Sequence, residues 1–463
     1  MPLLEKNYMI SKDKVLYNLS LFRILYIISL MLEIVAYPPI ELAAGYLNGV
    51  TFVWGIVICF HFLFHDPQKL NINHKKIAIS FILVCLLTSF INFSTNILMN
   101  LISVFNNFMY LFLFLGMKKN TSKEDIDKEM NFILKFIVFF SSLISLIGIY
   151  ISFRYKHIYF MGHNIGIFEN RFFGISTNPN QLGFLSAISI FACDLLNDKY
   201  MKSKFKFNFL LSIIFILFNT CVLFLTDSNA SFVFVTIYLA IRIFYENFSK
   251  YEKIKDINFI RELIYVVASM MLIVSGSFLT RISCQRFMNR VINHQKYNIS
   301  DHSIKIEIKE GESHFGRGGH ELSSGRISLF KQGMQLAKIR PLLGLGRENL
   351  SYYGEIYIKG GLLFSYKHFD LHNLYLTLLV SYGMIGFSLF ICLIILILCN
   401  LFYTSYININ NNNGKFISKL FAIIISYLSY VNFEVGGMSG IAISDVLLWV
   451  FIGYFMTFSD QII

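Results

Sequence analysis

Long apolar runs separated by short polar connections dominate the chain. About twelve of them approach the roughly 20 residues that an α-helix needs to cross a bilayer. The pattern predicts an all-α fold, a polytopic integral membrane bundle of about twelve transmembrane helices. The runs lie at residues 15–37, 42–64, 77–93, 97–116, 132–153, 180–196, 208–225, 231–246, 259–279, 384–403, 416–432 and 440–458.

Lysine and arginine residues occupy every second connection between these runs. The basic segments are 1–14, 66–76, 117–131, 197–207, 247–261 and 404–419, whereas 38–41, 94–96, 226–230 and 433–439 contain neither Lys nor Arg. Cytoplasmic loops of membrane proteins carry this excess of positive charge. The distribution predicts a multi-pass protein of the cytoplasmic membrane with both termini in the cytoplasm.

Two connections on the predicted outer side, 154–180 and 280–371, are longer than the rest. A structureless connection as long as the second is uncommon, so we expect a folded, functional extracytoplasmic segment. The chain then divides into three parts. They are an N-terminal bundle of about nine helices at 1–279, a large loop with amphipathic helices at 280–371, and a motif helix with about three transmembrane helices at 372–463.

Composition narrows the class of protein further. Of 463 residues, 55% are hydrophobic and 15% charged, which disfavours soluble globular folds, and the six prolines argue against disorder. The first apolar run is too long for a signal-peptide core. The seven cysteines form no CxxC pair or Cys/His cluster, so neither a metal site nor a disulfide framework is expected. Fourteen of the 40 Lys and Arg residues lie at 281–371, so the net charge of +12 points away from nucleic acid and towards an anion on the outer side.

The large outer loop contains two patterns of interest. Apolar residues at helical spacing follow Ser323 and Ser324 and end before Pro341, which predicts an amphipathic helix on the membrane, although a plain packing helix fits most of its residues as well. Gly344 and Gly346 then form a GxG turn, which is weak evidence for phosphate binding.

The segment that begins at Asp370 is a sharper candidate. Asp370 can cap a short helix whose first turn holds His372 and Asn373, and a helix N-terminus favours a neutral imidazole and offers N–H groups to phosphate. The alternative is an interfacial polar residue at position 372 with Asn373 as a second cap. The residues alone do not separate the two.

The smaller outer loop ends in a turn, Asn178-Pro179-Asn180, just before an apolar run. Arg171 precedes it, and by itself an arginine there fits a lipid-headgroup anchor. Arg23, Glu33 and Asp194 lie within apolar runs, where each can make a buried contact or reach the interface.

Three stretches together resemble the O-antigen ligase and O-antigen polymerase family of bacterial membrane glycosyltransferases. They are Arg171-Phe172-Phe173-Gly174 followed by Asn178-Pro179-Asn180, similar to R-x-x-G…N-P-N; Arg326 leading to Arg340-Pro341-Leu342-Leu343-Gly344-Leu345-Gly346, similar to R…P-L-x-G-x-G; and His372-Asn373, nine residues, then Gly383-Met384-Ile385-Gly386, which fits HN-x9-GxxG. One departure is Asn229, which stands where the family's T-x-S-R-G/A-S stretch usually has an arginine. If that arginine binds the donor diphosphate in relatives, another cation is needed here, and Arg281, Arg286, Arg317 and Arg347 are available.

The resemblance implies glycosyl transfer from an undecaprenyl-diphosphate-linked glycan to a glycan acceptor on the outer face of the membrane. His372 is then expected to take the acceptor's proton, and Arg171 and Arg326 to stabilise the leaving diphosphate. Asn373, Asp370, Asn180 and Arg347 are expected to bind substrate. Neither metal nor cofactor is expected. A flippase and a chain-length regulator of the same pathway are candidate partners.

Two reactions share these motifs. A polymerase joins lipid-linked repeat units into O-antigen, capsule or exopolysaccharide, whereas a ligase moves the finished glycan to a lipid A core or another acceptor. We favour the polymerase, because most such pathways need one. A transporter of lipid-linked sugars is the alternative of another class, and it predicts ionisable residues at the membrane centre and two related halves. A non-catalytic scaffold is a third possibility.

Overall fold

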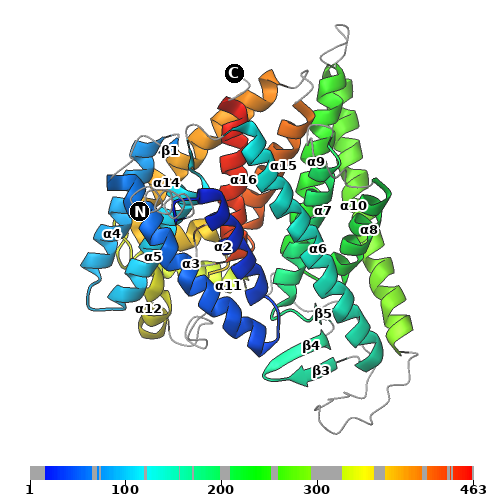
Figure 1. The fold of residues 1–463 in the computed structure, drawn as a ribbon, viewed down its shortest axis with the longest axis horizontal. Coiled ribbons are helices and arrows are strands. Elements are labelled where there is room, and N and C mark those ends of the chain that lie inside the picture. Colours follow the sequence, from blue (N-terminus) through cyan, green and yellow to red (C-terminus); the bar gives the residue numbers. More distant parts are fainter. Residues whose placement is uncertain are drawn as a thin grey trace, which may run out of the picture.

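The computed structural model is a bundle of helices with a small β-sheet at one end (Figure 1). It describes residues 16–64, 70–71, 74–118, 122–155, 157–168, 171–198, 209–251, 259–293, 326–358, 371–408, 414–434, 438 and 442–460. The first nine helical elements are α2 (Leu19–Glu33), α3 (Pro38–Phe64), α4 (Lys75–Ile91), α5 (Ile97–Met109) with its π-helical continuation η1 (Tyr110–Phe114), α6 (Lys123–Tyr155), α7 (Pro179–Leu196), α8 (Phe209–Thr226) and α9 (Asn229–Tyr251).

The C-terminal half continues with a very long helix. The elements are α10 (Phe259–Asn293), α11 (Arg326–Ala337), the 3-10 turn η2 (Arg347–Asn349), α12 (Leu350–Tyr357), α14 (Leu374–Ile407), α15 (Gly414–Tyr430) and α16 (Ile443–Asp460). Every predicted apolar run coincides with a helix. Among the described residues, eight helices are long and apolar enough to cross a membrane. The protein is therefore an all-α, multi-pass membrane protein, while the number twelve and the three-part division stay predictions.

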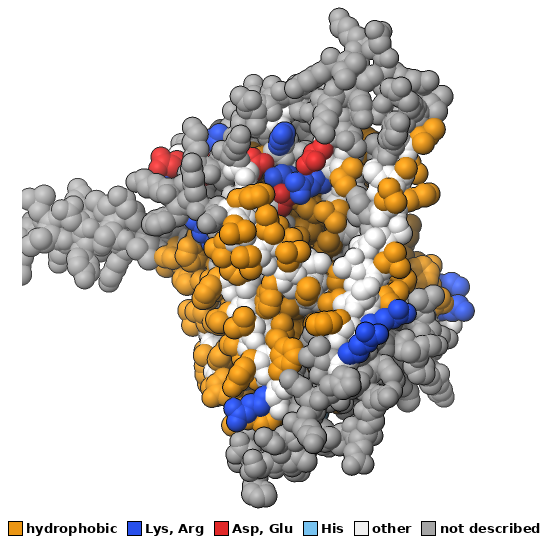
Figure 2. Space-filling model, turned by 90° about the vertical axis from the view of Figure 1, so that its right-hand side faces the viewer, with side chains coloured by type: hydrophobic (Ala, Val, Ile, Leu, Met, Phe, Trp, Pro, Cys, Tyr) orange, Lys and Arg blue, Asp and Glu red, His pale blue; other side chains and the backbone are white. Residues whose placement is uncertain are grey.

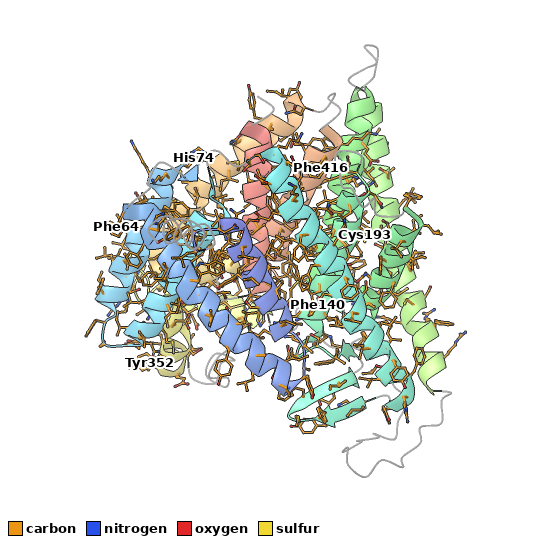
Figure 3. All side chains as sticks on the ribbon, viewed as in Figure 1. Phe64, His74, Phe140, Cys193, Tyr352 and Phe416 are labelled. Carbon is orange, nitrogen blue, oxygen red and sulfur yellow. The ribbon has the colours of Figure 1, made fainter. Side chains whose placement is uncertain are left out.

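The two ends of the bundle carry different segments. A short ladder of β1 (Leu70–Asn71) and β2 (Met117–Lys118) lies at one end, and a three-stranded sheet lies at the other (Figure 1). His74 and Tyr352 likewise lie at opposite ends (Figure 3). Hydrophobic side chains cover the middle of the face in Figure 2, and charged side chains gather towards its ends. Segments predicted on opposite sides of the membrane thus lie at opposite ends of the bundle.

The sheet fills part of the smaller outer loop, where the sequence predicts no strand. It consists of β3 (His157–Phe160), β4 (His163–Phe168) and β5 (Arg171–Gly174), all antiparallel. Gly174, at φ +59°, packs on α6 so closely that a Cβ on Gly148 would lie 2.4 Å from the Gly174 Cα. This contact fixes the end of β5, and with it the start of α7, against the bundle.

Buried ion pairs join helices where the sequence leaves polar residues in apolar runs. The Arg23 guanidinium on α2 lies 3.1 Å from the Glu129 carboxylate on α6, which also accepts from the Tyr454 hydroxyl on α16 at 2.9 Å. Asp194 on α7 pairs with Arg242 on α9 at 2.9 Å and with Lys419 on α15 at 3.2 Å. In both groups a charge is buried beside an opposite charge, as burial in an apolar medium requires.

Helix α14 bends at Gly383, whose φ of +64° is not helical. The chain from 341 to 346 lies in this bend. Leu345 N–H donates to the Val380 carbonyl at 3.0 Å, and Met384 N–H donates to the Pro341 carbonyl at 2.8 Å. Carbonyl and N–H groups released by the bend are thereby satisfied by the outer segment.

Candidate functional site

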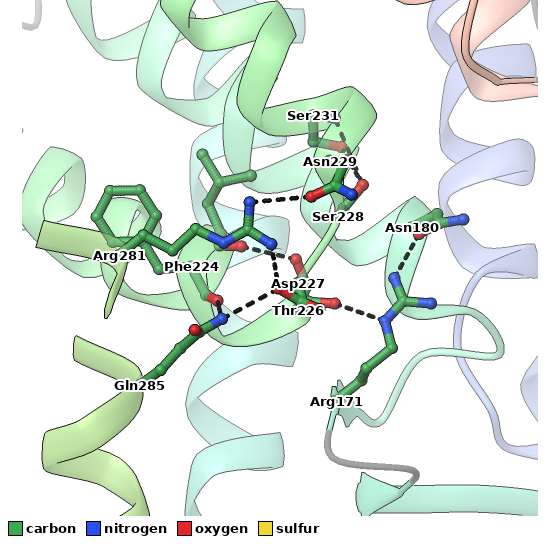
Figure 4. Close-up of polar contacts among 11 residues, drawn as sticks. Arg171, Asn180, Phe224, Thr226, Asp227, Ser228, Asn229, Ser231, Arg281 and Gln285 are labelled. Atoms are coloured by element: carbon green, nitrogen blue, oxygen red, sulfur yellow. Dashed lines mark hydrogen bonds and ion pairs between the residues drawn. The ribbon is translucent and has the colours of Figure 1, made fainter. Parts of the chain in front are cut away.

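Arg171 and Asn180 meet at the junction of β5 and α7. Asn178 caps α7 by accepting from Asn180 N–H at 2.8 Å, and Pro179 occupies the first helical position. This places the Asn180 side chain beside Arg171, whose guanidinium donates to the Asn180 side-chain oxygen. Arg171 Nε also donates to the Thr226 carbonyl at 2.9 Å, so it bridges α7 and the end of α8 (Figure 4). Arg171 is thus held between helices at the sheet end of the bundle.

Glu434 connects three of the predicted site residues. Its Oε1 accepts from Asn180 Nδ2 at 2.8 Å and from the Arg326 guanidinium at 2.8 Å, and its Oε2 lies 3.4 Å from His372 Nδ1. Glu434 follows α15 and is buried. Through Asn180 the network extends to Arg171. Residues far apart in sequence therefore converge on one buried carboxylate.

His372 lies two residues before the start of α14. Of the two interpretations left open by the sequence, the one that places His372 and Asn373 in the first helical turn is wrong, because α14 begins at Leu374. Asn373 is a cap, as the other interpretation has it, and accepts from Leu376 N–H at 2.9 Å. His372 instead has a left-handed backbone, with φ +49°. Asp370, the expected cap, lies outside the described residues.

Two hydrogen bonds hold this segment against the chain before Glu434. Asn373 Nδ2 donates to the Asn432 carbonyl at 3.2 Å, and Leu374 N–H donates to the Val431 carbonyl at 2.9 Å. The position of His372 relative to Glu434 is consequently set by backbone and cap contacts on both sides.

Arg326 begins α11, the predicted amphipathic helix. That helix packs on α14 at Gly333, where a Cβ would lie 2.6 Å from Leu376. Its Ile327, Phe330 and Met334 are exposed, in agreement with an apolar outer face. Close packing on α14 holds the Arg326 end of the helix over the segment of His372.

Arg281 lies beside Asn229, the position where the family usually has an arginine. Its guanidinium donates to the Asn229 side-chain oxygen at 3.0 Å and pairs with Asp227 (Figure 4). Gln285 also donates to Asp227, at 3.1 Å, and the Phe232 ring lies 5.4 Å from the Arg281 guanidinium carbon. Since Arg171 contacts Thr226, the two arginines lie on either side of the Thr226–Asp227 step.

The remaining predicted residue, Arg347, belongs to another group of contacts. It begins η2, whose Glu348 accepts from Ser103 at 2.7 Å and whose Asn349 accepts from Asn100 at 3.2 Å, both on α5. Arg171, Asn180, Arg326 and His372 are joined through Glu434 by the contacts above, and Arg347 is not part of that series.

Sequence reasoning missed Glu434 and Asp227. Glu434 is the lone acidic residue in a short connection without Lys or Arg, and this feature alone does not indicate a functional role. Asp227 lies inside the departing stretch but has no partner nearby in sequence. Each carboxylate pairs with an arginine more than 50 positions away in the sequence, so neither pair is visible in a local pattern.

Comparison with known families bears on the same residues. Residues 212–391 match the O-antigen ligase family. The match covers less than half of the chain, includes Asn229, Arg281, Arg326 and His372, and leaves Arg171 and Glu434 outside. It confirms the resemblance to the O-antigen ligase and polymerase family. A search among curated proteins gave no match.

Proposed function

We propose that the protein is a glycosyltransferase that polymerises undecaprenyl-diphosphate-linked repeat units into surface polysaccharide on the outer face of the cytoplasmic membrane. The observation that carries this proposal is the convergence of Arg171, Arg326 and His372 through Asn180 and Glu434. Both termini would lie in the cytoplasm, with the three-stranded sheet on the outer side.

The arginines suit a leaving diphosphate. Guanidinium groups form paired, charge-assisted hydrogen bonds to phosphate oxygens and stabilise the charge that develops as the glycosidic bond breaks. Arg171 and Arg281 flank the Thr226–Asp227 step, and Arg326 approaches from α11. Three cations against the carboxylates of Asp227 and Glu434 leave a net positive site for the donor.

His372 suits the acceptor. Its imidazole takes the proton of the attacking sugar hydroxyl as the oxygen bonds to the donor's anomeric carbon, and the bond from that carbon to the phosphate oxygen breaks with its electron pair on the diphosphate. We favour a second lipid-linked glycan as acceptor, which makes the protein a polymerase. Transfer of a finished chain to a lipid A core, as in a ligase, is the alternative.

A surface-glycan profile of a deletion strain tests the proposal. The strain is complemented with wild type, His372→Ala, Arg326→Ala or His163→Ala, the last being a histidine of the outer sheet that lies 3.0 Å from Glu41 and serves as control. We expect single lipid-linked units without long chains for His372→Ala and Arg326→Ala, and normal polymer for His163→Ala. Long chains retained on undecaprenyl diphosphate would instead identify a ligase. Units confined to the cytoplasmic leaflet would favour a transporter, and normal glycan with both site variants would refute the catalytic assignment.

A further inference from the structure

Glu434 differs from the other described carboxylates at this end of the bundle because it contacts both an arginine and the histidine of the site. The side chain is almost completely buried, with 9% exposure. One carboxylate oxygen accepts hydrogen bonds from Asn180 and Arg326 at 2.8 Å each, and the other lies 3.4 Å from His372 Nδ1, which is ion-pair distance but longer than an ordinary hydrogen bond. A buried charge is costly unless donors or opposite charges lie near it, and here those groups belong to the residues expected to handle substrate.

Hydrogen bonds of neighbouring residues fix the backbone on which Glu434 and His372 lie. The connection after α15 is tied to the start of α14 by the Leu374–Val431 and Asn373–Asn432 hydrogen bonds. His372 precedes these bonded residues, and Glu434 follows them two residues after Asn432, so the backbone positions of both residues are fixed relative to each other. This preorganises the backbone from which the imidazole and the carboxylate approach each other.

We propose that Glu434 is a positioning residue that makes His372 an effective base and holds Arg326 beside it. This inference rests on the proposed glycosyl transfer. The carboxylate favours the tautomer with hydrogen on Nδ1 and leaves Nε2 to accept the acceptor hydroxyl's proton. The same arrangement of base and carboxylate operates in serine hydrolases, where the carboxylate orients the imidazole and stabilises the imidazolium.

The proton and charge balance of the step is simple. As the hydroxyl oxygen bonds to the anomeric carbon, its proton passes to His372 Nε2, and the electron pair of the breaking bond leaves with the diphosphate. The imidazolium formed lies beside the Glu434 carboxylate, which offsets its positive charge. At the same time Arg326, oriented through the other carboxylate oxygen, faces the growing negative charge of the leaving group.

Several other polar and charged groups surround this pair. Arg326 approaches from α11, Asn180 and through it Arg171 from the α7 side, and the buried phenol of Tyr430 from α15. Tyr430 in turn interacts electrostatically with the buried Asp445 of α16. Among the described residues, Glu434 thus supplies the negative charge that faces His372.

The test compares purified full-length variants, reconstituted in bilayers and supplied with lipid-linked repeat units extracted from the deletion strain. Glu434→Gln keeps the shape and an acceptor oxygen for Arg326 and Asn180 but removes the charge. We expect kcat to fall about 100-fold or more, the order of a general-base contribution, with KM changed less than about threefold. Glu434→Asp should recover part of kcat, and Glu434→Ala should also raise KM because Arg326 loses its partner.

Glu41→Gln is the matched control, since Glu41 also pairs with a histidine, His163, at 3.0 Å but outside this network. It should leave kcat and KM at wild-type values. In a double variant, Glu434→Gln should add little to His372→Ala, because the two residues act as a unit. Wild-type kcat for Glu434→Gln, with His372→Ala inactive, would overturn the role of Glu434 alone. Full activity of His372→Ala would overturn the proposed function itself.

Discussion

Gly344 packs its backbone directly against that of Gly383. A Cβ on Gly344 would lie 2.4 Å from the Ser381 carbonyl and 2.6 Å from Gly383 N, and a Cβ on Gly383 would lie 2.3 Å from the Leu342 carbonyl. Both glycines also have positive φ, +73° and +64°. Two glycine motifs that are distant in sequence therefore form one close backbone contact, and the GxG turn serves packing of the outer segment.

Gly383→Ala should destabilise the protein. The side chain would meet backbone atoms in a left-handed conformation, so we expect a loss of about 2 kcal/mol or more, measured as a lower Tm of the purified protein in detergent. Gly276→Ala is the control, because a Cβ on that α10 glycine meets nothing within 4 Å. It should leave Tm unchanged or raise it. An unchanged Tm for Gly383→Ala would show that the bend can relax.

The sequence predicts the fold well where burial in lipid dictates it. Each long apolar run became a helix, since lipid-exposed backbone must satisfy its hydrogen bonds internally. The sheet from His157 to Gly174 was missed because strands of four to six residues leave little periodic signal. The resemblance to the family singled out Arg171, Arg326 and His372 as candidate site residues, but it did not include Glu434. The role proposed for Glu434 depends on packing that brings position 434 beside position 372, which no local pattern encodes.

On the proposed function, Arg281→Ala should strongly reduce glycosyl transfer. If Arg281 takes the place of the arginine that the family usually has at position 229, the loss of its guanidinium should lower the rate about 10- to 100-fold. This is the range seen when one charge-stabilising group is removed. Arg286→Ala is the matched control, because Arg286 is an exposed arginine on the same helix. Glycan chain length and in vitro turnover are the measurements.

A double variant tests the Arg281 prediction by rescue of the lost rate. Asn229→Arg combined with Arg281→Ala returns a guanidinium to the position the family usually uses, and it should recover part of the lost rate. Equal losses in Arg281→Ala and Arg286→Ala, or wild-type turnover in Arg281→Ala, would contradict the assignment.

Asn180→Asp should lower turnover strongly, although it only replaces the side-chain amide nitrogen with an oxygen. Asn180 donates to Glu434 and accepts from Arg171, so an aspartate would place a second carboxylate against Glu434 and remove the donor. Like charges at this distance repel, and the network would rearrange. We expect at least about a tenfold loss of turnover. Gln181→Ala, at the exposed neighbour, should have no effect. An active Asn180→Asp enzyme would argue that the Asn180 contacts to Arg171 and Glu434 are not needed for turnover.

Glu129→Ala should cost stability without touching the site. The change would leave the buried Arg23 charge without its carboxylate and the Tyr454 hydroxyl without its acceptor, a loss of about 3–5 kcal/mol for a broken buried pair. Arg23→Met combined with Glu129→Leu removes both charges and should be less destabilising than Glu129→Ala alone. The exposed Lys128–Glu124 pair on the same helix is the control, and Glu124→Ala should leave Tm unchanged. Thermal unfolding of the wild type and the three variants in the same detergent is the measurement. A double variant less stable than Glu129→Ala would mean that lost packing around these side chains, and not the uncompensated charge, causes most of the destabilisation.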